Sequence, residues 1–235
     1  MTINNFEKSI INNFVKIKRI VDFNFRTDSL LPLDFTATNT ELSDEILANT
    51  DLFSEWVNNK LTAKNARYGI GGYNEHRTIY TRSSHFDTGE EPRRLHLGVD
   101  IWGPVNTSIY NFYDATVHSF ANNNNFGDYG ATIILSYNID GFEFNALYGH
   151  LSLNSLVGLE EGKFIPAGTK IAEFGAKEEN GYWPAHLHFQ IIKDMQGLKG
   201  DYPGVCKFSE REKYLANCPD PNLILEATFK NNQEQ

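Results

Sequence analysis

Two histidines, His186 and His188, occupy alternate positions of an apolar, β-branched and aromatic run over residues 186–192. Such a composition predicts a β-strand. Because residues i and i+2 of a strand point to one face, the two imidazoles share a face, and Leu187 and Phe189 point the other way, into a core. Paired imidazoles on a rigid strand suit a metal site, although an isolated His-x-His is about as often a pair of surface histidines.

A second motif, His96-x-x-x-Asp100, places a carboxylate four residues after a histidine. In an extended segment this spacing puts both side chains on one face. Imidazole nitrogen and carboxylate oxygen suit zinc. A third nitrogen from the His-x-His strand would leave one position open, as in a catalytic rather than a structural zinc site. Cys206 and Cys218 lie outside these motifs, so we do not expect a thiolate-rich structural site.

A third motif, Tyr148-Gly149-His150-Leu151-Ser152, ends a predicted strand. Four of the seven histidines therefore lie in three short motifs within predicted strands. The other three, His76, His85 and His118, have no such context. We interpret them as solvent-facing or ordinary core histidines, the commoner fate of a lone histidine.

In this order, the three motifs resemble those of the lysostaphin/LytM-type zinc endopeptidases, which include peptidoglycan DD-metalloendopeptidases. Tyr129-Gly130 before a predicted strand, and the glycine-containing run from Gly162 to Gly175, are similar to further elements of that family. The resemblance covers about residues 95–192.

The resemblance implies a zinc cofactor held by His96, Asp100 and His188. It also implies that His150 and His186 are catalytic, binding the attacking water and stabilising the developing oxyanion. The activity implied is hydrolysis of peptide bonds, in peptidoglycan cross-links or in muropeptides. The spacing alone does not say which histidine of the 186/188 pair binds zinc.

A second, wider resemblance extends over about residues 66–225. It depends on the run from Gly72 to Thr81 and on residues 218–222, Cys-Pro-Asp-Pro-Asn. Both are similar to parts of a peptidase-type module that some bacteria carry fused to kinase-like and aminotransferase domains, which implies that the natural substrate need not be peptidoglycan. Trp183-Pro184-Ala185 departs from the family's small Gly-Pro-type sequence before His-x-His, which implies a bulkier groove wall.

Helical patterns are confined to the first part of the chain. Apolar residues recur at roughly helical spacing within residues 1–20, and a second helix is predicted to extend through Leu61. Thr40 or Ser43 could cap that second helix, with acidic residues in its first turn. Residues 32–40 between the two are interpreted as a connection.

After residue 75 short β-type runs alternate with turns. Strands are predicted over residues 77–81, 98–102, 115–120, 131–137, 142–148, 170–174 and 186–192. Asp140-Gly141 supplies the positive φ that a tight hairpin turn needs. We therefore expect a mainly β fold: an antiparallel β-sheet groove, which the resemblance implies is of the LytM or duplicated-hybrid-motif type. The expected divisions are an N-terminal helical segment (1–65), the zinc peptidase domain (66–195) and an irregular C-terminal extension (196–235).

Composition and charge limit the partners. Hydrophobic residues make up 40% of the chain and its net charge is −9, which argues against nucleic acid or an anionic membrane surface. No run approaches the roughly 20 apolar residues of a membrane span. No signal peptide is visible, so we expect a cytoplasmic protein, or a secreted or periplasmic one if a leader has been removed. Two cysteines fit a disulfide or two free thiols equally well.

Three functions remain open at this point. The resemblance favours a zinc metalloendopeptidase with a peptide or peptidoglycan-derived substrate. A second is a non-catalytic LytM-like regulator that binds a partner in its groove, but such proteins usually lack metal ligands, and here all are present. A cytoplasmic zinc hydrolase acting on another amide uses the same chemistry, so the motifs do not separate it from the first.

Overall fold

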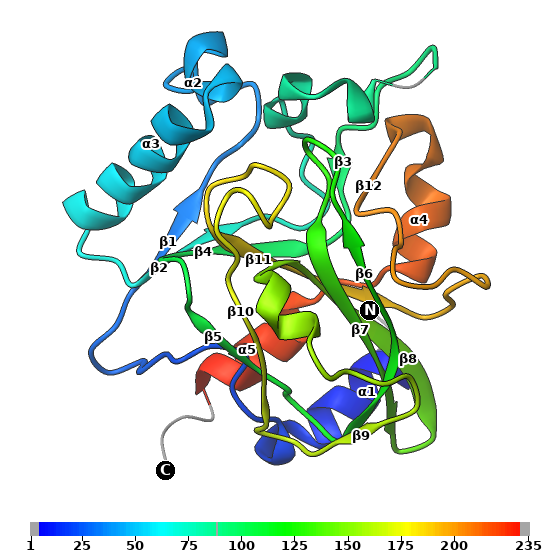
Figure 1. Ribbon diagram of the computed structural model, residues 1–235. Helices are drawn as coiled ribbons and strands as arrows, with labels where there is room; N and C mark the ends of the chain where they lie inside the picture. Colours follow the sequence, from blue (N-terminus) through cyan, green and yellow to red (C-terminus); the bar gives the residue numbers. More distant parts are fainter. Residues whose placement is uncertain (1–4, 88, 231–235) are drawn as a thin grey trace.

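An eight-stranded sheet forms the centre of the computed structural model, which describes residues 5–87 and 89–230 (Figure 1). Its spatial order is β1 (Leu30–Leu33), β2 (Tyr68–Gly71), β4 (Val99–Trp102), β11 (His186–Ile192), β8 (Phe142–Leu151), β7 (Gly130–Ile139), β6 (Ala115–Asn123) and β9 (Phe164–Ile165). Only β1 and β2 pair in parallel. The expected mainly antiparallel β fold is confirmed.

Two small sheets flank the large one. β10 (Lys170–Glu173) pairs with β5 (Ser108–Tyr110), and β12 (Val205–Cys206) pairs with β3 (Leu95–His96). The β7–β8 hairpin turns at Asp140 and Gly141, whose φ angles of 52° and 79° are those of a type I′ turn. The hairpin predicted from Asp-Gly is therefore confirmed.

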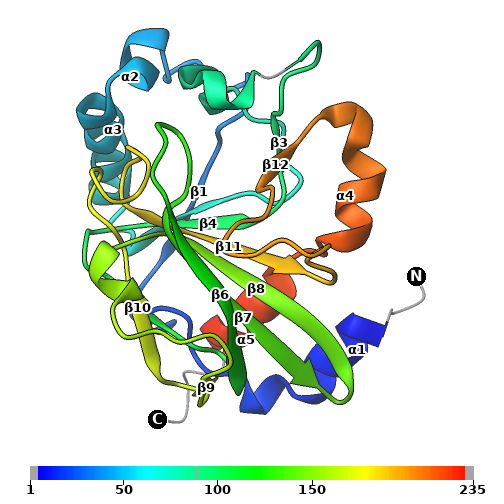
Figure 2. The same ribbon diagram turned by 45° about the vertical axis from the view of Figure 1, so that its right-hand side comes forward.

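Helices cover the sheet at its two ends. α1 (Asn5–Asn12) lies near the turn of the β7–β8 hairpin and contacts α5 (Asn222–Lys230), whereas α2 (Asp44–Ala48) and α3 (Thr50–Ala63) lie beside β1 (Figures 1 and 2). α4 (Arg211–Asn217) lies beyond β12. The 3-10 helices are η1 (Phe14–Lys16), η2 (Ile79–Arg82), η3 (Ser84–Phe86), η4 (Leu153–Leu156) and η5 (Phe208–Glu210).

Three apolar clusters hold these elements together. The largest joins α1 and α5 to one face of the sheet, and Phe6 packs edge-on against Phe144 of β8. A second joins α3 to Trp102 and Trp183. The third encloses Leu95, Cys206 and Cys218, and both cysteines are buried free thiols.

The N-terminal segment differs from the expectation in two respects. Its helical character and the cap at Ser43 are confirmed, but the single helix expected up to Leu61 is two helices: Ser43 Oγ caps α2, and Asn49 ends α2 and starts α3, where its Oδ1 accepts the backbone N–H groups of Asp51 and Leu52. The interpretation of residues from 32 onward as a connection is wrong for its first part, because Leu30–Leu33 pairs with β2. Pro32 is compatible with a strand here, since β1 is at the sheet edge.

Two other segments also differ. Residues 77–81 do not form a strand, because Ile79–Arg82 closes a 3-10 turn in which Ser83 N–H donates to Tyr80 O. The C-terminal extension is not irregular throughout, because α4 and α5 follow β12. Burial of Ile224 and Leu225 in the main core explains why α5 is ordered against the sheet. The proposed boundaries at residues 65 and 195 remain predictions.

Within the described residues, every helix is too short or too polar to cross a membrane.

Two glycines of similar backbone conformation test how tightly the loop before β11 packs on β7. Gly130 and Gly158 have φ angles of 62° and 74°. A Cβ at Gly130 would lie 2.0 Å from Glu179 O, whereas a Cβ at Gly158 would meet nothing within 4 Å. We expect Gly158→Ala to lower the free energy of unfolding by about 1 kcal/mol, from backbone strain alone.

Gly130→Ala should lower the free energy of unfolding by about 3 kcal/mol or more, because the backbone at Glu179 must also move to make room for the new Cβ. Urea denaturation of the two variants measures both losses. Equal losses of free energy of unfolding in the two variants would show that the loop at Glu179 moves away from the new Cβ without an energetic cost.

Candidate active site

The register of β11 between its two neighbours brings the sequence motifs together. Asp100 of β4 lies directly opposite His188, and Trp102 lies opposite His186. On the other side of β11, Gly149 of β8 lies opposite His188, so the third motif reaches the same place. His96 arrives from β3, a separate short strand held by β12.

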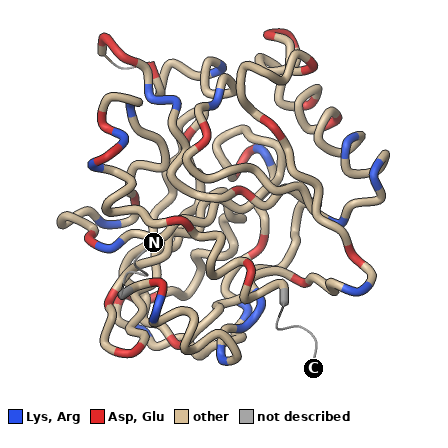
Figure 3. Tube along the Cα trace, turned by 180° about the vertical axis from the view of Figure 1, so that it is seen from behind, with Lys and Arg blue, Asp and Glu red and all other residues tan. Residues whose placement is uncertain are grey.

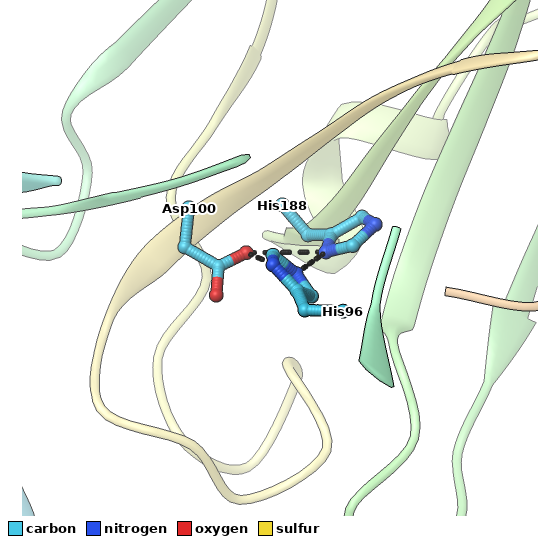
Figure 4. Close-up of side chains that lie close together, drawn as sticks. All are labelled: His96, Asp100 and His188. Carbon is cyan, nitrogen blue, oxygen red and sulfur yellow. Dashed lines mark hydrogen bonds and ion pairs between the residues drawn. The ribbon is translucent and has the colours of Figure 1, made fainter. Parts of the chain in front are cut away.

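Three donor atoms converge at this point (Figure 4). His188 Nδ1 lies 2.9 Å from His96 Nε2 and 3.1 Å from Asp100 Oδ1, and His96 Nε2 lies 3.3 Å from the same oxygen. All three side chains are buried, with exposed fractions of 0–3%. The group could hold a metal ion. The structure therefore assembles the three residues predicted to be ligands.

Outer hydrogen bonds fix which ring nitrogens are free. His96 Nδ1–H donates to Gly72 O at 2.8 Å, and His188 Nε2–H donates to the amide oxygen of Gln190 at 2.9 Å. Each ring then presents an unprotonated nitrogen to the other and to Asp100. Three lone pairs that face one another across about 3 Å repel unless a cation lies between them.

The dimensions fit zinc. Zinc–nitrogen and zinc–oxygen bonds of about 2.0–2.1 Å in a tetrahedron place the ligand atoms about 3.3 Å apart. The observed separations of 2.9–3.3 Å match one triangular face of that tetrahedron. Three protein donors leave the fourth corner for water or substrate, as in catalytic sites.

Gly98, between His96 and Asp100, makes this approach possible. A Cβ on Gly98 would lie 2.7 Å from both Cε1 and Nε2 of His188, and 2.8 Å from the Phe189 carbonyl oxygen. Since real Cβ atoms do not come so close, a larger residue here would displace the His188 ring or β11 itself.

His150 and His186 lie beside the three donors, with ring centroids 4.1 Å apart. His150 Nδ1–H donates to Asn180 O, and His186 Nδ1–H donates to Pro184 O, each at 2.8 Å. Nε2 is thus the free nitrogen of both rings. The His186 ring also stacks on Trp102, with centroids 3.9 Å apart and planes inclined by 11°.

His150 has a φ of 63°, an uncommon conformation for a residue other than glycine. Two backbone hydrogen bonds hold it: His150 N–H donates to Tyr129 O, and Gly175 N–H donates to His150 O. Strain of this kind often accompanies functional positions.

Burial favours the neutral form of His96, His150 and His186. It lowers the pKa of His96 to about 4, with Arg77 adding to the effect, and it lowers the pKa of His186 to about 4. Burial and the neighbouring His186 also hold the pKa of His150 well below its usual value. Although burial opposes ionisation of Asp100, His96 and Arg77 outweigh it and hold the pKa of that carboxyl well below its usual range.

A cavity of about 130 Å³ opens onto Asp100, His150, His186 and His188. Aromatic rings dominate its walls: Tyr80, Phe86, Trp102, Tyr129, Trp183 and Tyr202. Trp183 is part of the wall, as its position before the His-x-His motif implied. His85 also lines the cavity, although its sequence context gave no reason to place it there.

Arg77 and Tyr80 were missed as members of the site because they were interpreted as part of a strand. The signal for them lay in the run from Gly72 to Thr81, which the wider resemblance had singled out without a role. Arg77 is 1% exposed and pairs with Asp100.

The comparison with known protein families matches the segment of the chain that contains the site residues. Residues 94–200 match the sequence profile of Peptidase family M23. None of the curated proteins matches the chain.

Among solved structures, the catalytic domain of the antimicrobial peptidase lysostaphin from Staphylococcus simulans is similar, with 24% identity, a TM-score of 0.44, and coverage of 74% of this chain and 97% of that one. A catalytic-domain mutant of the prophage-encoded M23 protein EnpA from Enterococcus faecalis gives 20% identity, a TM-score of 0.35, and coverage of 50% and 84%. A zinc-containing peptidase from Vibrio cholerae gives 24% identity and a TM-score of 0.34.

For the Vibrio protein the match covers 42% of this chain and 27% of that one, so it spans about a quarter of that protein's length. The profile match is the more informative finding, because it includes all five site residues on β3, β4, β8 and β11. The chain therefore matches peptidase family M23 over residues 94–200, a little under half of its length.

Proposed function

We propose that the chain is a zinc-dependent metallopeptidase that hydrolyses peptide bonds by an activated water. The observation that carries this proposal is the convergence of His96 Nε2, Asp100 Oδ1 and His188 Nδ1 at 2.9–3.3 Å, with the other nitrogen of each ring committed to a hydrogen bond. A bound zinc supplies Lewis acidity and lowers the pKa of its water toward about 7.

His150 and His186 supply the proton transfers. Because each ring commits Nδ1–H to a backbone carbonyl, Nε2 can accept a proton from the attacking water and later return it to the leaving amine. A ring that carries the proton donates a hydrogen bond to the developing oxyanion. Stacking on Trp102 fixes the plane of His186 and so the direction of its Nε2.

The cavity, the charge and the match to peptidase family M23 support a proposal for the substrate class. A volume of about 130 Å³ between aromatic walls admits a short stretch of extended peptide with small side chains. Acidic and basic residues are interspersed along the Cα trace in Figure 3, and the net charge is −9, so the overall charge does not favour binding to an anionic polymer. We propose peptidoglycan-derived peptides, in the form of muropeptides, as substrates.

Loss of any of the three donors should abolish metal binding. We expect one zinc per chain in the wild-type protein, and little in His96→Ala, Asp100→Ala or His188→Ala, since each removes a primary bond. Elemental analysis after dialysis measures the stoichiometry. His118→Ala, which changes a histidine outside the site, should keep its zinc. Stoichiometric zinc in His188→Ala would refute the assignment.

Loss of the other two histidines should separate catalysis from metal binding. His150→Asn suits the positive φ, because asparagine tolerates that conformation, so the fold should persist. We expect His150→Asn and His186→Gln to keep zinc while kcat falls roughly 100-fold or more.

Zinc content and turnover of a fluorogenic peptide, measured on the same samples, provide the test. If His186→Gln loses zinc and a His188 variant keeps it, the roles of the pair are reversed.

Soluble fragments should be better substrates than intact sacculi. The negative net charge disfavours accumulation on an anionic wall, whereas it has little effect on a small peptide. We expect faster cleavage of purified muropeptides than of sacculi at equal cross-link concentration, with the difference shrinking as salt screens the repulsion. Release of fragments from sacculi without turnover of muropeptides would contradict this substrate class.

A further inference from the structure

A buried arginine approaches the oxygen of Asp100 that the histidines leave free. Arg77 Nη1 donates to Asp100 Oδ2 at 2.5 Å, while Asp100 Oδ1 faces His96 and His188. The side-chain exposed fractions of Arg77 and Asp100 are 1% and 3%. The two oxygens of the Asp100 carboxylate therefore face different partners: Oδ1 faces the metal position and Oδ2 faces the guanidinium of Arg77.

A second carboxylate, that of Glu75, binds Arg77 on the side of the guanidinium away from Asp100. Arg77 Nε donates to Glu75 Oε2 at 2.6 Å, and Tyr80 OH lies 3.3 Å from Nη1. Glu75, Arg77 and Asp100 thus form a row of alternating charge that ends at the metal position. Because Glu75 holds the other side of the guanidinium, Arg77 cannot move with the Asp100 side chain if that side chain rotates.

The same segment orients the second ligand. Gly72 O accepts His96 Nδ1–H at 2.8 Å and lies 3.3 Å from Arg77 Nη2. Backbone hydrogen bonds join this segment to β3: Asn74 N–H donates to His96 O, and His96 N–H donates to Glu75 O. Both ligands of the His96-x-x-x-Asp100 motif are thereby held by residues 72–77.

We propose that Arg77 is a positioning residue that makes Asp100 bind metal through Oδ1 alone. This inference rests on the proposed function. A charge-assisted hydrogen bond to Oδ2 competes with metal for that oxygen, so the carboxylate acts as a one-atom ligand and the site keeps an open fourth corner. A second bond from Oδ2 would occupy that corner, which the attacking water needs.

A merely structural role for Arg77 predicts different behaviour. If Arg77 only ties residues 72–77 to the sheet, its loss lowers stability without altering the metal's ligand geometry. The chain offers a matched control in Arg94, a buried arginine that also pairs with a carboxylate, Asp87, and whose side chain forms no hydrogen bond or ion pair with a proposed ligand among the described residues.

The experiment compares Arg77→Gln, Arg77→Lys and Arg94→Gln. Zinc affinity is measured by competition with a chromophoric chelator, and ligand geometry by the visible absorption of Co²⁺ added to the metal-free proteins. We expect Arg77→Gln to bind zinc 10- to 100-fold more weakly, the usual effect of losing an outer partner. Its cobalt bands should weaken as the coordination number rises. Arg77→Lys, which keeps a charge and a donor, should recover part of both.

Arg94→Gln should lose stability while its zinc affinity and cobalt spectrum stay as in the wild type. If Arg77→Gln and Arg77→Lys both match the wild type in affinity and spectrum, the inference is overturned and the proposed function stands. Should Arg77→Gln fail to fold, Arg77→Lys decides: a lysine has one donor group in place of the planar guanidinium and replaces the contact to Oδ2 only in part, so its zinc affinity and cobalt bands should still fall below those of the wild type, and an Arg77→Lys protein that matches the wild type in both would overturn the inference. A wild-type protein that binds neither metal would overturn the proposed function itself.

Discussion

The pairing of β11 with β4 is the constraint on which the site depends. It sets Asp100 against His188 and Trp102 against His186. Because side chains alternate along a strand, a slip of one residue would turn both histidines into the core and bring Leu187 and Phe189 to the cavity. Register is fixed here by the buried apolar face of β11, where Leu187, Phe189 and Ile191 are fully enclosed.

Every donor is also held from outside, by residues 72–77 for two of them and by β11 itself for the third. Gly72 orients His96, Arg77 orients Asp100, and Gln190 orients His188. The amide of Gln190 in turn donates to Pro203 O and to the sulfur of Cys218. Segments before and after residues 94–200 therefore contribute to the site, and Tyr73 OH joins these two segments by donating to Cys218 O at 2.5 Å.

The aromatic wall gives the cavity its small size, and the N-terminal helices support that wall. Phe53 of α3 packs near Trp102 and Trp183, with ring centroids 6.0 and 6.5 Å apart. Arg82 lies 4.7 Å above the Trp183 ring, and burial lowers the pKa of this arginine to about 10. Residues 44–63 thus act on the site through packing, which narrows the space a substrate can enter.

The sequence alone indicated the chemistry: spacing placed His96 and Asp100 on one face and His186 and His188 on another, and the family resemblance implied that His188 is the third ligand. Strand periodicity predicted most of the sheet, because it is a local property. The sequence did not determine what lies around those motifs. Arg77 was placed in a strand, His85 was assigned no role, and the helix α5 was missed, since each depends on contacts between residues far apart in the chain. Only the tertiary structure decides which carbonyl or guanidinium faces a given ligand, because that choice is made by packing and not by spacing.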